Sequence, residues 1–232
     1  MKKPTIFKTL IAVVLLLLSF SSYSQLRKSF SSRYTTSLNG DILVIGNNIL
    51  NRDNGTGQKP NDAYNDVGSG SQYNDRFDMR NIDIDNETSF NSSSATLTIP
   101  QASKSCFEIV YAALYWSGTY QGSDRSKINQ IRLKTPEAGA AYKALTGTLI
   151  YDEGGTGVTG VYKSKPYACF KEITDEVKAA KEGVYTVADL VCSEGILNGD
   201  GGNSAGWSIF VIYKDPLLPS KYITSFDGFS II

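Results

Sequence analysis

The stretch "SAGWSIFVIYKD", residues 204–215, decides the fold class of this chain. Its apolar side chains continue almost without a break from Trp207 until Lys214. A short continuous apolar run that ends at polar residues is typical of a strand that is covered on both faces. A second run, "YAALYWSG" (111–118), has the same character. We therefore expect both runs, with Trp116 and Trp207, in a core, the alternative for the two tryptophans being an exposed sugar-stacking role.

The rest of the chain holds short segments rich in Val, Ile, Thr, Tyr and Phe, separated by Gly, Asn, Asp or Pro. This pattern predicts strands at 41–50, 93–100, 106–118, 129–135, 142–152, 161–174, 185–192, 207–215 and 221–231. Only 174–183 is typical of a helix, a short connector with Thr174 as its N-cap. Many short strands without long helices between them predict an all-β protein, an antiparallel β-sandwich that is jelly-roll-like or immunoglobulin-like.

The N-terminus has the layout of a bacterial export signal. Residues 1–24 combine three lysines with an apolar stretch at 11–18 and a small polar end. We expect the mature chain to begin at Gln25, outside the cytoplasm, at the cell surface or in the extracellular medium. No later segment approaches the roughly 20 apolar residues of a membrane-spanning helix, so no transmembrane segment is expected in the mature chain.

The remaining residues predict a single domain. We expect a linker at 25–39 and one β-sandwich at 40–232, interrupted by a long polar loop at 51–92. The sequence ends inside a predicted strand at Ile232. Either the domain continues into further repeats or it stands alone, and the sequence leaves both alternatives open.

Charge and composition exclude several classes of function. Without residues 1–24, which hold three of the 23 basic and none of the 23 acidic residues, the net charge is −3. No basic stripe is present to bind nucleic acid or an anionic membrane. The chain contains no histidine. Nucleophiles that are activated by histidine, and zinc sites that contain it, are therefore excluded.

The three cysteines all lie in the part of the chain that is expected to be exported. The runs "YACFKEIT" and "VYTVADLVC" predict two strands that fold back around 181–183 and bring Cys169 opposite Cys192. We expect a disulfide between them, which would stabilise the fold by about 3 kcal/mol in the chain-entropy account. The alternative is that these thiols are free and buried. No partner is assigned to Cys106.

Two groups of residues suggest ligand binding. In "DIDNE" (83–87), Asp83, Asp85 and Glu87 offer the hard oxygen ligands that calcium prefers, although the segment does not match an EF-hand loop. The sequence predicts no cofactor, and calcium at this place is the alternative. The chain also holds 14 tyrosines. Four of them are expected to contact a glycan if they line one exposed face or groove; they are Tyr64, Tyr73, Tyr120 and Tyr162.

Several short motifs occur in one order along the chain. They are "GDILVIGN" (40–47), "DIDNETSFNSSSATLTIP" (83–100), "YAALYWSG" (111–118), "YACFKEITDEV" (167–177), "GVYTVADL" (183–190), "AGWSIFVIYKDP" (205–216) and "FDGF" (226–229). This order resembles the N-terminal β-sandwich module of large, adhesin-like bacterial surface proteins, which tandem immunoglobulin-like repeats follow. The export signal is similar to those of bacteria with type IX secretion. The resemblance implies paired core strands at 111–118 and 205–215, and no catalytic residue.

Three functional hypotheses follow. The first is a non-catalytic, exported surface module with a structural or adhesive role, whose partners are other surface proteins or glycans. The second is a carbohydrate-binding module that uses exposed aromatic side chains. The third is a glycoside hydrolase that depends on two carboxylic acids placed across a cleft.

Overall fold

The computed structural model describes residues 25–53, 74–85, 89–100, 106–155, 162–199 and 201–231. The predicted export signal at 1–24 lies outside the described residues. The strands are β1 (Gln25–Asn48), β2 (Leu50–Arg52), β3 (Met79–Asn81), β4 (Ser92–Leu97), β5 (Glu108–Thr119), β6 (Gln130–Lys134), β7 (Lys143–Thr146), β8 (Thr148–Asp152), β9 (Pro166–Glu172), β10 (Gly183–Ala188), β11 (Ala205–Lys214) and β12 (Ser220–Ile231). The helices are the short 3₁₀ turn η1 (Asn74–Arg76) and α2 (Thr174–Ala180).

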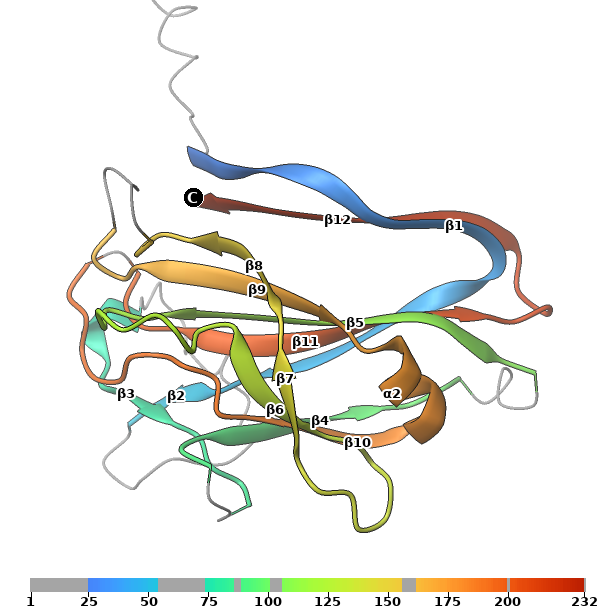
Figure 1. Cartoon of the computed structure of the whole chain (residues 1–232), viewed down its shortest axis with the longest axis horizontal. Coiled ribbons are helices and arrows are strands. Elements are labelled where there is room, and N and C mark those ends of the chain that lie inside the picture. Colours follow the sequence, from blue (N-terminus) through green and yellow to red (C-terminus); the bar gives the residue numbers. More distant parts are fainter. Residues whose placement is uncertain are drawn as a thin grey trace, which may run out of the picture.

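The strands form two main sheets that lie one above the other (Figure 1). The larger sheet has six strands in the order β12-β1-β11-β5-β9-β8, and the smaller has four in the order β4-β10-β6-β7. A two-stranded pair, β2 with β3, lies at one end. Every pairing among the described strands is antiparallel. The predicted all-β antiparallel sandwich is confirmed.

The two apolar runs of the sequence are neighbouring strands in the core. β5 and β11 pair in a register that sets Trp116 opposite Trp207, and these side chains are only 2% and 5% exposed. The indole of Trp116 donates to the carbonyl of Ile128, and that of Trp207 donates to the hydroxyl of Ser93. Both tryptophans are core residues with satisfied N–H groups, as the apolar runs predict.

The segment 142–152, predicted as one strand, is divided between the two sheets. β7 belongs to the four-stranded sheet, whereas β8 forms one edge of the six-stranded sheet. Gly147 separates them, and a Cβ atom there would lie 2.2 Å from the Trp116 ring. Only glycine fits at this corner, because the indole of the core occupies the space of a side chain.

The predicted linker at 25–39 is wrong, because these residues are the first half of β1. That half pairs with β12, and from Gly40 onward β1 pairs with β11 instead. A Cβ atom at Gly40 would lie 2.0 Å from the carbonyl oxygen of Tyr213, so the change of partner requires glycine. We call residues 25–39 together with β12 the ribbon.

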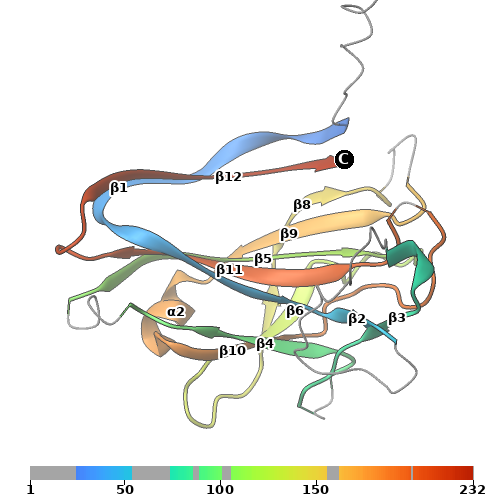
Figure 2. The same cartoon turned by 180° about the vertical axis from the view of Figure 1, so that it is seen from behind.

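The ribbon folds back over the outer face of its own sheet (Figures 1 and 2). Tyr34 of the ribbon stacks on Tyr111 of β5, with ring centroids 4.1 Å apart. Near the other end, Phe229 stacks on Tyr151, which belongs to β8. The six-stranded sheet thus curls into a half-barrel whose two edges come close together.

The polar segment 51–92 is only partly a loop. β2 pairs with β3 across it, and Met79 of β3 is fully buried in the core. Residues 54–73 and 86–88 lie outside the described residues. The apolar residues within the segment therefore attach it to the end of the sandwich.

The expected disulfide between Cys169 and Cys192 is wrong, because all three cysteines are free thiols. Cys169 lies on β9 in the six-stranded sheet, whereas Cys192 follows β10 of the four-stranded sheet. The strands do not form a hairpin, since α2 carries the chain between the two layers. Burial raises the pKa of Cys169 to about 12. The alternative interpretation, a buried free thiol, describes Cys169.

The connector helix α2 lies where it was expected, but its cap differs. Its N-cap is Ile173, without a side-chain hydrogen bond, and the hydroxyl of Thr174 accepts instead from the backbone N–H of Ala112 in β5. The side chain predicted as a cap therefore attaches the helix to the larger sheet. No helix in the described ranges is long and apolar enough to cross a membrane.

Candidate ligand-binding groove

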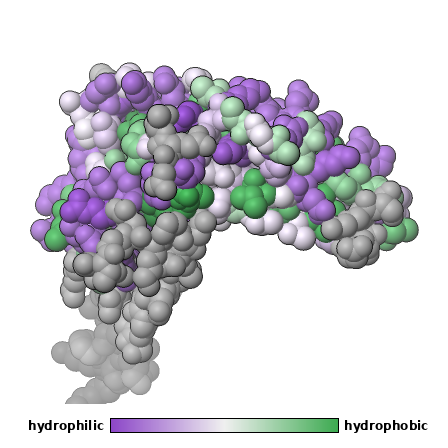
Figure 3. Space-filling view, turned by 90° about the horizontal axis from the view of Figure 1, so that it is seen from below, coloured by the Kyte–Doolittle hydropathy of each residue, from purple (hydrophilic) through white to green (hydrophobic). Residues whose placement is uncertain are grey.

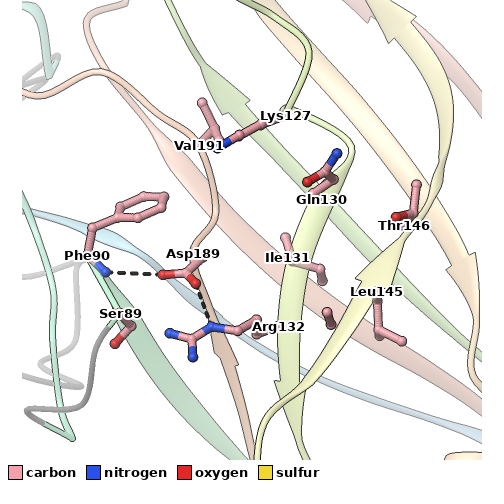
Figure 4. A pocket seen from close by; sticks show the side chains of 11 residues that line it. Ser89, Phe90, Lys127, Gln130, Ile131, Arg132, Leu145, Thr146, Asp189 and Val191 are labelled. Carbon is pink, nitrogen blue, oxygen red and sulfur yellow. Dashed lines mark hydrogen bonds and ion pairs between the residues drawn. The ribbon is translucent and has the colours of Figure 1, made fainter.

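A hollow of about 620 Å³ opens on the side of the four-stranded sheet (Figure 4). It lies between strands β6 and β7 on one side and the segments 89–90 and 189–191 on the other. Ile131 and Leu133 of β6 are buried in the core, so the alternation of the strand turns Gln130 and Arg132 outward. On the coloured part of this side, hydrophilic residues are mixed with smaller hydrophobic patches (Figure 3). We call this hollow the groove.

Asp189 organises one wall of the groove. Its carboxylate accepts a hydrogen bond from the backbone N–H of Phe90 at 3.1 Å and pairs with the guanidinium of Arg132 (Figure 4). The backbone of Asp189 has a φ of 60°, a left-handed conformation that Asp tolerates better than most residues. This conformation, directly after β10, lets one side chain connect three segments that are distant in the sequence.

Phe90 stands at the rim of the groove with its ring 52% exposed. The residue after it, Asn91, is fully buried and exchanges two hydrogen bonds with the backbone of Leu190. The backbone on both sides of the ring is therefore held in place. An exposed aromatic ring on a fixed backbone offers a flat apolar surface to a ligand.

The opposite wall offers hydrogen-bonding groups. Gln130 on β6 and Thr146 on β7 are exposed, and their side chains make no hydrogen bond within the described part of the chain. Lys127 adds a cation at one end of the groove. The groove thus combines one aromatic ring, one ion pair and several side chains that can bind hydroxyl groups.

A tyrosine connects the groove to the predicted calcium motif. The guanidinium of Arg132 lies 4.8 Å from the centroid of the Tyr142 ring, a cation–π contact. The hydroxyl of Tyr142 donates to the carboxylate of Asp85. Arg132 is therefore held from two sides, by Asp189 and by the Tyr142 ring.

The structure brings Asp83 and Asp85 together, as the calcium prediction requires. Both carboxylates lie within hydrogen-bonding distance of the Ser92 hydroxyl, at 2.7 and 3.2 Å. The third expected ligand, Glu87, lies outside the described residues. Among the residues that the structure describes, no three acidic or thiol side chains gather closely enough to hold a metal ion. Calcium binding at this place stays a prediction.

Of the four tyrosines expected to contact a glycan, the two that the structure describes, Tyr120 and Tyr162, do not line the groove. Tyr64 and Tyr73 lie outside the described residues. Tyr120 packs against the core, with the guanidinium of Arg125 5.5 Å from its ring centroid, and Tyr162 lies beside Arg27 in the same manner. Both rings are half-buried and have contacts within the chain.

A scan against protein-family models, a search of curated proteins and a search of solved structures each found no match.

Sequence reasoning missed the residues that form the groove. Gln130, Arg132 and Thr146 belong to none of the motifs named above, and the motifs that contain Phe90 and Asp189 assign no role to either residue. The available signal was weak: Phe90 is the only aromatic residue in the polar stretch 85–100. Its position beside Arg132 depends on how β10 and β4 pair, which the local sequence does not encode.

Proposed function

We propose that this protein is an exported, non-catalytic surface module that binds glycans and has an adhesive role. The observation that carries the proposal is the fixed, exposed ring of Phe90 beside the Arg132–Asp189 pair. The apolar face of a sugar ring packs on an aromatic side chain, and its hydroxyl groups bind paired charged groups and amides. The groove offers both kinds of contact.

The chemistry of the groove supports binding rather than cleavage. Hydrolysis of a glycosidic bond by two carboxylic acids requires one acid on each side of the bond, about 5 to 9.5 Å apart. Asp189 is the only acid among the described residues that line the groove, and it is paired with Arg132. The sequence contains no histidine, so a nucleophile that is activated by histidine is also excluded.

The composition of residues 1–24 supports export, because it has the basic, apolar and small polar regions of a cleavable signal. An exported module with a glycan groove would act at the cell surface, with glycans or glycosylated surface proteins as its partners. The resemblance to adhesin-like surface proteins favours the same role.

A glycan array with the purified protein tests this function. We expect binding to a subset of glycans, and we expect Phe90→Ala to weaken it about ten-fold through loss of the stacking surface. The matched control is Tyr222→Ala, which removes an aromatic ring that is 75% exposed on the ribbon, away from the groove. The control should bind as the unaltered protein does.

Two outcomes would overturn the proposal. If no glycan binds, or if Phe90→Ala and Tyr222→Ala behave alike, the groove has no glycan-binding role. If incubation releases reducing sugar ends from a bound glycan, the non-catalytic part of the proposal is wrong.

A further inference from the structure

A second hollow, of about 410 Å³, lies beneath the ribbon on the concave face of the six-stranded sheet. The ribbon that covers it is the uppermost layer in Figure 1. Strand residues 226–228 contribute the cover, and Ile150 of β8 lies at the side. This hollow is separated from the groove by the core of the sandwich, because the two lie on opposite sheets.

The floor of the hollow is a row of small residues from three adjacent strands. In the strand register, Gly206 of β11 lies opposite Ser117 of β5, which in turn lies opposite Ala168 of β9. Towards the other end of the same face the side chains become large, and Tyr111 and Ile212 fill the space under the ribbon. The hollow therefore exists because the side chains at one end of the concave face are small.

The cover of the hollow is fixed by an ion pair within the ribbon. Arg33 of β1 donates to the carboxylate of Asp227 at 2.6 Å, and the Asp227 side chain is only 7% exposed. The guanidinium also lies 4.5 Å from the ring centroid of Phe170 on β9. The contact with Phe170 therefore attaches the ribbon to the sheet, and the ion pair sets Asp227 at the edge of the hollow.

Polar groups in this region have no partner within the described part of the chain. The hydroxyls of Tyr115, Ser117 and Ser208 line the hollow and make no hydrogen bond there. Tyr115 and Ser208 are half-buried and Ser117 is exposed, so these three hydroxyls are open to the hollow and can hydrogen-bond to a ligand.

The charges around the hollow favour a neutral ligand. Arg33 and Asp227 offset each other. Burial, together with the nearby carboxylate of Asp227, raises the pKa of Tyr115 to about 12, so its phenol remains a neutral donor at ordinary pH. The hollow thus presents neutral hydroxyls, the Tyr115 ring and a compensated ion pair.

We propose that the hollow binds a single neutral ring that bears hydroxyl groups, the terminal unit of a saccharide. The ring would lie on the small residues Ser117 and Ala168, with Tyr115 at its side and the Arg33–Asp227 pair above. The site extends the proposed glycan binding to a second place on the opposite sheet. A protein with two such sites connects two glycan chains, or binds one surface with increased avidity.

Saturation-transfer NMR with glucose, galactose, mannose and N-acetylglucosamine, each added alone, tests the proposal. We expect at least one of these sugars to receive saturation from the protein. Ser117→Phe places a large ring on the floor of the hollow and should weaken that signal, and any signal that remains comes from the groove. Ser117 is exposed and away from the sandwich core, so an unchanged melting temperature shows that this variant folds.

Thr146→Phe is the matched control, since it makes the same kind of change in the groove. It should leave the signal of the hollow intact while weakening binding on the glycan array. Tyr115→Phe, which removes only a hydroxyl, should weaken the binding of the sugar about five-fold.

The proposal is overturned if none of the four sugars binds the unaltered protein. It is also overturned if Ser117→Phe binds as well as the unaltered protein does. Failure of the proposed glycan binding in the groove is a separate result. In that case, glycan binding on the array would be the same for Phe90→Ala and for the unaltered protein.

Discussion

The two faces of the six-stranded sheet are covered in different ways. The inner face packs against the four-stranded sheet through large apolar side chains, and its two tryptophans have hydrogen-bonded N–H groups. The outer face is covered by the ribbon, which is part of the same sheet, through aromatic stacks, ion pairs and a smaller apolar cluster. A hollow remains there.

This difference arises because the ribbon covers the outer face with only two strands. A two-stranded ribbon buries little apolar area and is marginally stable alone, so it needs specific contacts to stay on the sheet. Polar contacts leave room for hydroxyl groups and for a ligand, whereas a close-packed face does not. The inner face should therefore govern global stability, and the outer face should govern local opening and binding.

The largest expected effect is on the inner face. Trp116→Ala would leave a cavity at a side chain that is 2% exposed and should cost about 3–5 kcal/mol of unfolding free energy. Urea denaturation followed by circular dichroism measures this change. Phe226→Ala, at a ring on the ribbon that is 61% exposed, is the control and should change stability by less than about 0.5 kcal/mol. Equal losses in the two variants would contradict the comparison.

The next effect concerns the attachment of the ribbon. Arg27 lies 3.1 Å from the carboxylate of Glu153, whose side chain is fully buried. Arg27→Met keeps the apolar stem but leaves that carboxylate with one fewer partner, at a cost of about 1–3 kcal/mol. Hydrogen exchange should become faster in residues 25–39 and in β12 and stay unchanged in β5. Faster exchange throughout both sheets would show that the ribbon is not a separate unit.

The thiols provide a comparison without mutation. Burial raises the pKa of both Cys169 and Cys192, so each is protonated and unreactive at pH 8 in the folded state. A thiol reagent should modify Cys106 first and the other two only on unfolding. The mass of the unmodified protein should not change with reductant. A mass that increases by two hydrogens on reduction would show that the protein contains a disulfide and would contradict this prediction.

The smallest effect is expected at the bend of the ribbon, where Lys221 pairs with Asp41. Its hydrogen bond to Lys221, assisted by the backbone N–H of Ile42, lowers the pKa of Asp41. Because the folded pKa lies below the unfolded value, this pair stabilises the protein above about pH 4 and is lost as the pH falls further. Asp41→Asn should lower the melting temperature slightly at pH 7, and the difference should disappear near pH 3. A difference that persists at low pH would contradict this origin.

Much of the secondary structure could be predicted from the sequence, because each strand carries its own signal. The run at 207–215 is β11, and the run at 106–118 is β5, within one or two residues at each end. The linker prediction at 25–39 failed because Ser and Thr dominate this segment, and its strand exists only through pairing with β12. The disulfide prediction failed for a similar reason. The strands β9 and β10 are neighbours in the sequence but lie in different sheets.

The sequence by itself determined the all-β class, the position of nearly every strand, the core tryptophans and the absence of histidine chemistry. These features depend on local alternation, composition and turn residues, which act over a few positions. The tertiary structure alone decided the curl of the larger sheet, the assembly of Phe90, Arg132 and Asp189, and the row of small residues under the ribbon. Such features depend on which strands pair and in which register, and those choices are made by contacts between residues far apart in the chain.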